Sequence, residues 1–302
     1  MTFEFETVDV FTDRQFGGNP LAVVVDAKGL STAQMQSIAA EFNLAETTFV
    51  LPPASPENMA QVRIFTPVDE MPFAGHPNVG TAFVLARRAV REGRPIDAGF
   101  LTFEEGAGLV RMELLRDGGS VVGARLTSPQ PFEIGTTVPS DIVAEACGLA
   151  VDDIETTHHE PVVASCGAAF VIAELKDCEV LSRVVPRADA FNDRLLPDQA
   201  VGVHLYAPAI PQEVDIQTRM FSMLQSIVED PATGSANVAL IGLLAHLDDD
   251  PVAGMEKRIG QGYHMGRPSV LDAAADRNDD GTIATYIGGR CVPVMRGVLD
   301  VA

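Results

Sequence analysis

Asp230-Pro-Ala-Thr-Gly-Ser-Ala236 is the stretch that decides the fold, because an earlier segment repeats its pattern. Residues 76–82 read His-Pro-Asn-Val-Gly-Thr-Ala and share Pro, Gly and Ala with it at matching places. Each segment follows a strand-like stretch, 63–66 (Arg-Ile-Phe-Thr) in the first case and 219–222 (Arg-Met-Phe-Ser) in the second. The order of strand, turn and helix therefore occurs twice, which predicts a duplicated α/β unit.

The helix expected after each repeated segment is apolar nearly all round, over 79–86 in the first and 238–244 in the second. A helix without a polar face is buried on most sides. We therefore expect an α/β (α+β) protein with two pseudo-symmetric domains, each a curled mixed sheet or barrel around a central helix. A Pro-rich link near residue 128 divides the chain into domains at 1–127 and 128–289, with 290–302 as a candidate completion of the first.

The composition excludes several classes of partner. The chain has 302 residues, with 21 Lys and Arg against 42 Asp and Glu, and a formal net charge of −21. A phosphate backbone or an anionic membrane surface would repel such a chain, so neither nucleic acid nor membrane is an expected partner. The sequence shows neither a secretory signal nor an apolar stretch of the roughly 20 residues that a spanning helix needs, so we expect a cytoplasmic protein.

Cysteine and histidine spacing gives no sign of a metal site. The four cysteines are widely and irregularly spaced, without a Cys-x-x-Cys pair, and are interpreted as reduced thiols. The six histidines also lack metal-ligand spacing. Residues 276–281 imitate the start of a calcium loop, but Ile287 stands where such a loop needs Glu, so a hairpin turn is expected there.

The starts of the two repeated helices are the candidate binding groups. In this alignment His76 and Asp230 occupy equivalent places, and Gly80-Thr81 and Gly234-Ser235 lie just inside the helices. The first N–H groups of a helix attract anions, so these starts could hold a small carboxylate. The alternative is that Asp230 and Thr81 or Ser235 merely cap their helices. Spacing alone leaves both interpretations open.

Several motifs together resemble the phenazine-biosynthesis PhzF-like family. They are Phe16-Gly-Gly-Asn-Pro, Ala45-Glu-Thr-Thr-Phe-Val, Phe65-Thr-Pro, Pro72-Phe-Ala-Gly-His-Pro, Glu229-Asp-Pro-Ala-Thr-Gly-Ser-Ala and Gln261-Gly-Tyr-His-Met-Gly-Arg-Pro-Ser. They occur in the family's order over nearly the whole chain. The resemblance implies a diaminopimelate epimerase-like fold with the active site in the cleft between two halves. It also implies a homodimeric isomerase that moves a proton on a small carboxylated, cyclic substrate without any cofactor.

The resemblance also implies roles for single residues. Glu46 matches the family's acid/base, and His76 and Asp230 match its other catalytic positions. The implied substrate-binding residues are Asn19, Gly75, Gly80, Thr81, Gly234 and Ser235. This chain departs from the family at Ala45, where many relatives have Ser, and at Asn78-Val79, where Thr-Leu is common. Both departures could alter which substrate fits.

Chemical reasoning agrees with a single carboxylate base. A proton shift needs a group that accepts a proton from one carbon and returns it to another, and a partly desolvated Glu with a raised pKa suits this task. Glu46 has no acidic equivalent in the second half, and neither Cys147 nor Cys166 lies at a repeated helix start, which disfavours a two-thiol racemase. Three alternatives stay open. Glu46 could be a solvated strand-edge carboxylate, and the protein could be an amino-acid epimerase or racemase, or a non-catalytic small-molecule binding protein.

The acidic surface sets one more requirement. A net charge of −21 would repel a small carboxylate, so the site needs local positive potential. We expect this potential to come from the two helix starts and from arginines such as Arg63 and Arg219. Structural roles on the strands are the alternative for both arginines.

Overall fold

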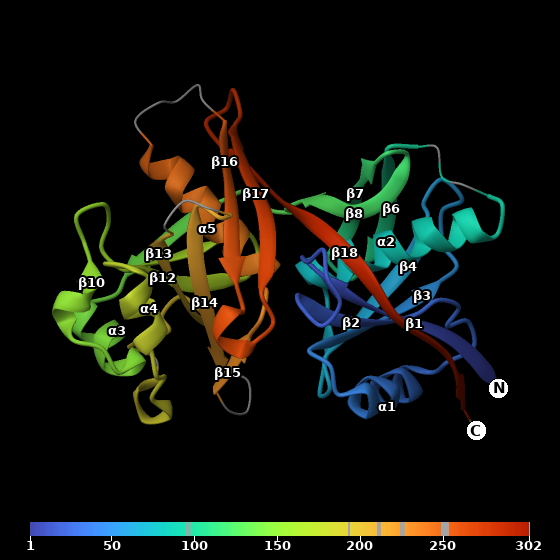
Figure 1. The fold of residues 1–302 in the computed structure, drawn as a ribbon, viewed down its shortest axis with the longest axis horizontal. Coiled ribbons are helices and arrows are strands. Elements are labelled where there is room, and N and C mark those ends of the chain that lie inside the picture. Colours follow the sequence, from blue (N-terminus) through green and yellow to red (C-terminus); the bar gives the residue numbers. More distant parts are fainter. Residues whose placement is uncertain are drawn as a thin grey trace. The chain divides into compact units, whose positions relative to one another are not determined.

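A computed structural model of the chain describes residues 1–94, 96, 98–192, 194–209, 213–223, 227–248 and 254–301. The chain divides into two compact units, whose elements are labelled in Figure 1. Unit 1 comprises Met1–Pro129 and Gly288–Ala302, and unit 2 comprises Gln130–Ile287.

Unit 1 is a closed barrel of strands. Its elements are β1 (Thr2–Val10), β2 (Asn19–Val24), α1 (Thr32–Phe42), β3 (Glu46–Leu51), β4 (Ala60–Phe65), β5 (Glu70–Met71), α2 (Gly75–Arg91), β6 (Phe100–Glu105), β7 (Gly108–Asp117) and β8 (Ser120–Thr127). Neighbouring strands pair in the order β1, β2, β3, β4, β6, β7, β8. The long strand β18 (Ile283–Asp300) pairs with both β8 and β1 and so closes the ring. The β2–β3 and β4–β6 pairs are parallel, because α1 and α2 connect them.

Helix α2 is the central helix of unit 1. It contacts β1, β2, β3, β7 and β8, and every residue from Gly75 to Ala86 is buried. Gly80 allows this close approach, since a Cβ atom there would lie 2.6 Å from Leu21 Cδ2 and 2.8 Å from Val10 Cγ2. The apolar sequence of the helix is thus explained by strands on most of its sides.

Helix α1 has the ends that its sequence predicts. Ser31 caps the first turn in a capping box with Gln34, and Asn43 ends the helix in a left-handed conformation with φ 50°. Its buried residues Met35 and Ala39 join a core cluster with Phe49 and other residues of β1, β2 and β4.

Unit 2 repeats this plan. Its elements are β9 (Glu133–Thr137), α3 (Ser140–Cys147), β10 (Ile154–Glu155), β11 (Val162–Ser165), β12 (Ala169–Leu175), α4 (Cys178–Arg183), β13 (Gly202–Pro208), β14 (Ile216–Met223), β15 (Ile227–Asp230), α5 (Gly234–Leu247), β16 (Met255–Gln261) and β17 (Ser269–Arg277). Strands pair in the order β9, β11, β12, β13, β14, β16, β17, with parallel pairs at β12–β13 and β14–β16. Helix α5 is the buried counterpart of α2.

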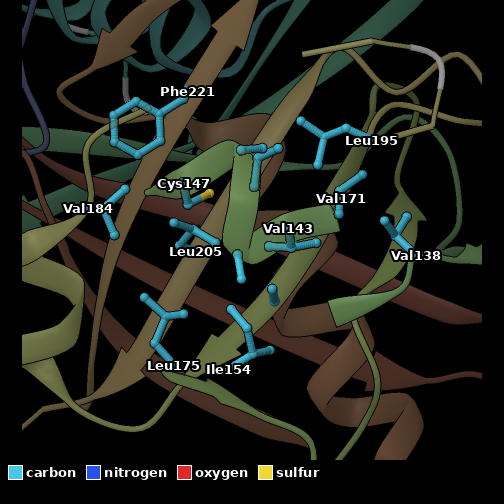
Figure 2. Packing of buried hydrophobic residues seen from close by; sticks show 14 of the residues in the cluster. Val138, Val143, Cys147, Ile154, Val171, Leu175, Val184, Leu195, Leu205 and Phe221 are labelled. Carbon is cyan, nitrogen blue, oxygen red and sulfur yellow. The ribbon is translucent and has the colours of Figure 1, made fainter. Parts of the chain in front are cut away.

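Unit 2 has a hydrophobic core cluster to which α3 and α4 contribute residues. Figure 2 shows Val143 and Cys147 of α3 packed among residues of neighbouring strands, including Leu175, Leu205 and Phe221. The four cysteines of the chain are thiols in this structure.

The strand pairing gives the true register of the internal repeat. Phe65 pairs with Glu70 in unit 1, and Phe221 pairs with Glu229 in unit 2. The central helix then starts at Gly75 and at Gly234, the same number of residues after each glutamate. The sequence read from these glutamates is Glu-Met-Pro-Phe-Ala-Gly-His-Pro-Asn-Val in unit 1 and Glu-Asp-Pro-Ala-Thr-Gly-Ser-Ala-Asn-Val in unit 2.

This register corrects the alignment made from sequence. Ser235, and not Asp230, is the counterpart of His76, and the helix expected from Asp230 begins only at Gly234. The alignment was wrong because Asp230 continues strand β15, pairing with Met220, and because the paired Phe and Glu are further apart in sequence in unit 2 (221 and 229) than in unit 1 (65 and 70). Asn78 and Asn237 support the new register, since each donates to the carbonyl four residues earlier, at 3.0 and 2.9 Å.

The calcium-like segment is the turn between β17 and β18, as expected, where Asn278 N–H donates to Thr282 O at 2.8 Å. The strand that follows this turn, β18, is continuous from Ile283 to Asp300.

Candidate active site

Glu46 is the first residue of β3 and stands beside Leu21 of β2 in the parallel pair. The next four residues of the strand, 47–50, are buried, so β3 is held in the barrel wall directly after Glu46. The Glu46 side chain is only 19% exposed, so it is not the solvated strand-edge carboxylate of the alternative interpretation. A carboxylate in this position is shielded from bulk water and can act on a neighbouring group.

That neighbouring group is the imidazole of His76, in the first turn of α2. His76 Nε2 lies 3.3 Å from Glu46 Oε2, and His76 Nδ1 lies 3.3 Å from the side-chain nitrogen of Asn19. Burial lowers the pKa of His76 to about 3, so the ring is neutral and the contact with Glu46 is not an ion pair. The structure thus brings together three residues that were predicted from three separate motifs.

The contact with Asn19 assigns the proton of the neutral ring. An amide nitrogen donates, so Nδ1 of His76 accepts and Nε2 carries the hydrogen. His76 Nε2 is buried and lies within hydrogen-bonding distance of Glu46 Oε2, but the two groups are not aligned for a hydrogen bond. Among the residues that the structure describes, His76 Nε2 has no aligned hydrogen-bond partner. The Nε2–H group of His76 is therefore available to a substrate atom beside Glu46.

A tight turn places Asn19. Gly18 has φ 63°, and a Cβ atom there would lie 2.2 Å from the carbonyl oxygen of Val10. The turn is also tied to β1, since the N–H of Phe16 donates to Asp9 Oδ2 at 2.7 Å. Glycine at position 18 is thus required by the backbone path that leads to Asn19.

Gly18→Ala is expected to lower the free energy of unfolding by about 2–4 kcal/mol, because it adds a left-handed alanine and a backbone clash. Gly29→Ala is the matched control, since Gly29 also has a positive φ, 101°, but nothing lies within 4 Å of its Cβ position. Urea unfolding of both variants measures the difference. Equal losses in the two variants would contradict the assigned clash.

The start of α2 offers free backbone donors. Its N-cap residue is Ala74, and no side chain caps the first turn. Gly75 and His76 therefore present backbone N–H groups at the positive end of the helix dipole. These N–H groups lie in the same turn of α2 as the imidazole that faces Glu46. The cap interpretation does not hold here: Thr81 lies in the second turn, is fully buried, and contacts Thr48 Oγ1 at 2.8 Å.

The other predicted residues of unit 1 have packing roles in this structure. Gly80 faces Leu21 and Val10, as described above, and Thr81 faces Thr48. The earlier alignment had placed both just inside the helix start, which is wrong because α2 begins at Gly75. We leave both out of the proposed substrate contacts.

Unit 2 has a comparable helix start with different side chains. Its N-cap is Thr233, and again no side chain caps the first turn of α5, where Gly234 and the partly exposed Ser235 lie. Asp230 ends β15 and accepts a hydrogen bond from Thr233 Oγ1 at 2.5 Å. Asp230 therefore holds the side chain of Thr233 just before α5 and does not cap the helix.

The repeat register shows which half carries the acid–base group. Because Phe65 matches Phe221, the β3–β4 and β13–β14 pairs align Glu46 with Gly202. The β2–β3 and β12–β13 pairs then align Asn19 with Ala168, while His76 aligns with Ser235. Unit 2 thus lacks a carboxylate, an imidazole and an amide at these three places. The asymmetry expected from sequence is present in the structure.

Arg63 and Arg219 are not free sources of positive potential. Arg63 forms a two-point ion pair with Glu70, at 2.7 and 2.6 Å, and Arg219 forms one with Glu229, at 2.8 and 2.9 Å. Each guanidinium also lies over a phenylalanine ring, Phe65 or Phe221. These matched pairs are structural, and the expectation that they supply local positive charge is wrong because each is neutralised by its partner.

Asn78 and Asn237 are a repeated pair that was not predicted from the sequence, and no role was predicted for Glu105. The signal was present, since Gly-x-x-Asn-Val occurs at both helix starts, but the wrong register hid it.

Among the described residues, no group of three or more His, Cys, Asp or Glu side chains is arranged to hold a metal ion. The same residues include no helix long and apolar enough to cross a membrane.

Two barrels of the same plan, each with a buried central helix, define the diaminopimelate epimerase-like fold. The family model described as phenazine biosynthesis-like protein matches residues 8–297, and the chain belongs to this family. The protein is an isomerase of the PhzF-like type.

Individual relatives agree over their full lengths. An uncharacterized isomerase of Mesorhizobium japonicum is 37% identical over 297 residues, covering 96% of each chain. The trans-2,3-dihydro-3-hydroxyanthranilate isomerase of Pseudomonas chlororaphis is 36% identical over 296 residues, covering 97% of each chain. The crystal structure of a PhzF-family phenazine biosynthesis protein from Bacillus anthracis superposes with a TM-score of 0.87 at 25% identity, covering 100% of both chains.

Proposed function

We propose that Glu46 is the acid and base that moves a proton between two carbons of a small carboxylated substrate. The observation that carries the proposal is the shielded pair of Glu46 Oε2 and His76 Nε2, 3.3 Å apart, with Asn19 holding the other ring nitrogen. A base must reach the proton that it removes, and a partly dehydrated carboxylate beside a fixed donor suits this task.

In the proposed steps, one carboxyl group both removes the proton and returns it. The Glu46 carboxylate takes a proton from one carbon, and the electron pair left behind moves into an adjacent conjugated system. The Glu46 carboxylic acid then gives the proton to a second carbon, which restores the carboxylate. The Nε2–H of His76 donates to the oxygen or nitrogen atom on which negative charge develops, and Asn19 keeps that hydrogen on Nε2.

A single base has a stereochemical consequence. Gly202 replaces Glu46 in the second half, so unit 2 has no second carboxylate at the matching place. The proton would leave from and return to the same face of the substrate, carried by one group.

The epimerase or racemase alternative finds less support. Burial raises the pKa of Cys147 to about 12 and that of Cys166 to about 11, and it also raises the pKa of Cys291. A thiol base needs the opposite shift. These buried cysteines are therefore packing residues in this account.

The substrate class follows from the relatives and from the helix starts. Since the Pseudomonas relative is named an isomerase of trans-2,3-dihydro-3-hydroxyanthranilate, we propose a small, unsaturated ring acid as substrate. Each helix start, taken by itself, suits a carboxylate, through the N–H group of Gly75 in unit 1 and through those of Gly234 and Ser235 in unit 2, and Asp230 suits a polar substituent. Homodimeric assembly and a cytoplasmic location are further proposals, which rest on the family resemblance.

The test uses trans-2,3-dihydro-3-hydroxyanthranilate, called the probe acid below. Proton NMR of the probe acid with wild-type enzyme should show a new isomer with a shifted ring double bond. Unchanged spectra at high enzyme concentration would contradict the substrate class. Inversion of a free amino acid by the same enzyme would favour the epimerase alternative.

A further inference from the structure

Glu105 is a half-buried titratable residue with a buried carboxyl group, which the proposed mechanism does not use. It ends β6, and neither carboxyl oxygen, though buried, has a well-aligned hydrogen-bond partner among the described residues. Burial raises the pKa of Glu105 to about 8, so most of the group is neutral at pH 7. A buried carboxyl without a cationic partner requires an explanation.

The polar neighbour of this carboxyl is Asn78, two residues after His76 in the first turn of α2. The interaction with Asn78 partly opposes the rise in the pKa of Glu105. The Asn78 side-chain nitrogen donates to Ala74 O at 3.0 Å, whereas its Oδ1 atom is buried without a donor in the described part of the chain. Since Asn78 lowers the pKa of Glu105, its amide donates to a carboxyl oxygen. A protonated Glu105 keeps an acceptor for this amide and adds one donor, whereas an ionised Glu105 only accepts.

The repeat register identifies the counterpart of Glu105 as Gln261. In the parallel pairs, Ala60 aligns with Phe103 in unit 1, and Ile216 aligns with Ile259 in unit 2. Two residues further along each strand are Glu105 and Gln261. The glycines that follow Glu105 and Gln261 have matching surroundings. A Cβ atom on Gly106 would lie 3.1 Å from Pro72 Cα, and one on Gly262 would lie 3.2 Å from the matching Pro231 Cα.

Gln261 shows what this position does. Its Oε1 accepts from the side chain of Asn237 at 2.8 Å and from the N–H of Thr233 at 3.1 Å. Its Nε2 donates to the carbonyl oxygen of Asp230 at 2.8 Å. One amide, acting as both donor and acceptor, thus holds the first turn of α5 against the segment before it.

We propose that Glu105 is a positioning residue that holds the first turn of α2, and with it His76, as Gln261 holds the first turn of α5. The inference rests on the proposed function of His76. A protonated carboxyl carries one donor and one acceptor, which is what an amide offers, whereas a carboxylate only accepts. Ionisation of Glu105 would therefore remove the donor, add an unpaired charge, and loosen the turn that carries His76.

The charged groups on the surrounding elements are engaged elsewhere. Glu104 of β6 accepts from the N–H groups of Ala54 and Ser55 and from Asn58, and Arg111 of β7 lies over the Phe100 ring. On the remaining elements Glu70 pairs with Arg63, and Glu46 faces the neutral His76. Burial and Asn78 alone set the titration of Glu105.

Glu105→Gln is the isosteric test, since it gives unit 1 the residue that unit 2 has. For wild type we expect kcat for the probe acid to fall above pH 8, by roughly tenfold at pH 9, because a group with that pKa is then mostly ionised. Glu105→Gln should match wild type at pH 7 and keep its activity at pH 9. Glu104→Gln is the matched control and should keep the alkaline fall.

Two kinetic results would overturn the inference: the same alkaline fall in Glu105→Gln, or loss of its activity at pH 7 while it remains folded. An NMR titration of the His76 ring protons, assigned by their absence in His76→Phe, needs no turnover. The His76 signals should shift with a midpoint near pH 8 in wild type and stay constant in Glu105→Gln. A constant signal in wild type, or the same shift in both, would refute the role of Glu105 even if the probe acid is not a substrate.

Discussion

Glu46→Gln is expected to lower kcat for the probe acid by roughly 10²–10⁴-fold, the range that positioned proton transfer contributes. Glutamine keeps the size of the side chain and its contact with His76 but cannot accept a proton from carbon. The proposed mechanism has no second base, because Gly202 occupies the matching place in unit 2. The loss should therefore fall on kcat, with KM changed little.

Glu57→Gln is the control for this substitution, since Glu57 is an exposed glutamate of the same unit. It should leave kcat within about twofold of wild type, as surface substitutions usually do. Circular dichroism and urea unfolding should show that Glu46→Gln is folded. Turnover by folded Glu46→Gln at the wild-type rate would remove Glu46 from the mechanism.

His76→Phe is expected to reduce kcat by roughly 10²-fold, the usual cost of removing one preorganised donor from an active site. Phenylalanine preserves the ring volume in the first turn of α2 but has neither Nε2–H nor an acceptor for Asn19. His76→Gln restores an N–H donor and should recover part of the loss. Because His76 is neutral, the loss should be the same from pH 6 to pH 8.

His246→Phe, at an exposed histidine near the end of α5, is the matched control and should retain wild-type kcat. An effect of His76→Phe confined to KM would show that the imidazole serves binding alone. A loss that appears only at low pH would contradict the neutral ring, since it would require a histidine that titrates near its ordinary pKa.

The fold was largely accessible from the sequence because its strongest signals are local. Apolar central helices and alternating strands follow from periodicity, and the duplicated plan follows from the repeat of strand, turn and helix. The exact register was not accessible. Asp-Pro at residue 230 is a common helix opening, and only the pairing of Glu229 with Phe221 shows that a strand continues to Asp230.

The site was accessible in part for a related reason. Glu46 and His76 were predicted from motifs, but their contact joins residues that are far apart in sequence. The pairing of Arg63 with Glu70 and of Arg219 with Glu229 depends on cross-strand geometry that a single sequence does not display. Glu105 was missed because an isolated glutamate at a strand end is usually solvated, and only the alignment with Gln261 gives it meaning.

Transfer of a substrate proton by Glu46 is the central claim, and solvent deuterium reports on it directly. Wild-type enzyme and Glu46→Gln are incubated with the probe acid in deuterium oxide, and the position of label is read by NMR. We expect the wild-type enzyme to isomerise the probe acid, with deuterium at the receiving carbon to the extent that the Glu46 carboxylic acid exchanges with solvent before it returns the proton, and we expect neither isomer nor label in the Glu46→Gln sample over the same period. Isomerisation or labelling of the probe acid by folded Glu46→Gln at the wild-type rate would contradict the claim.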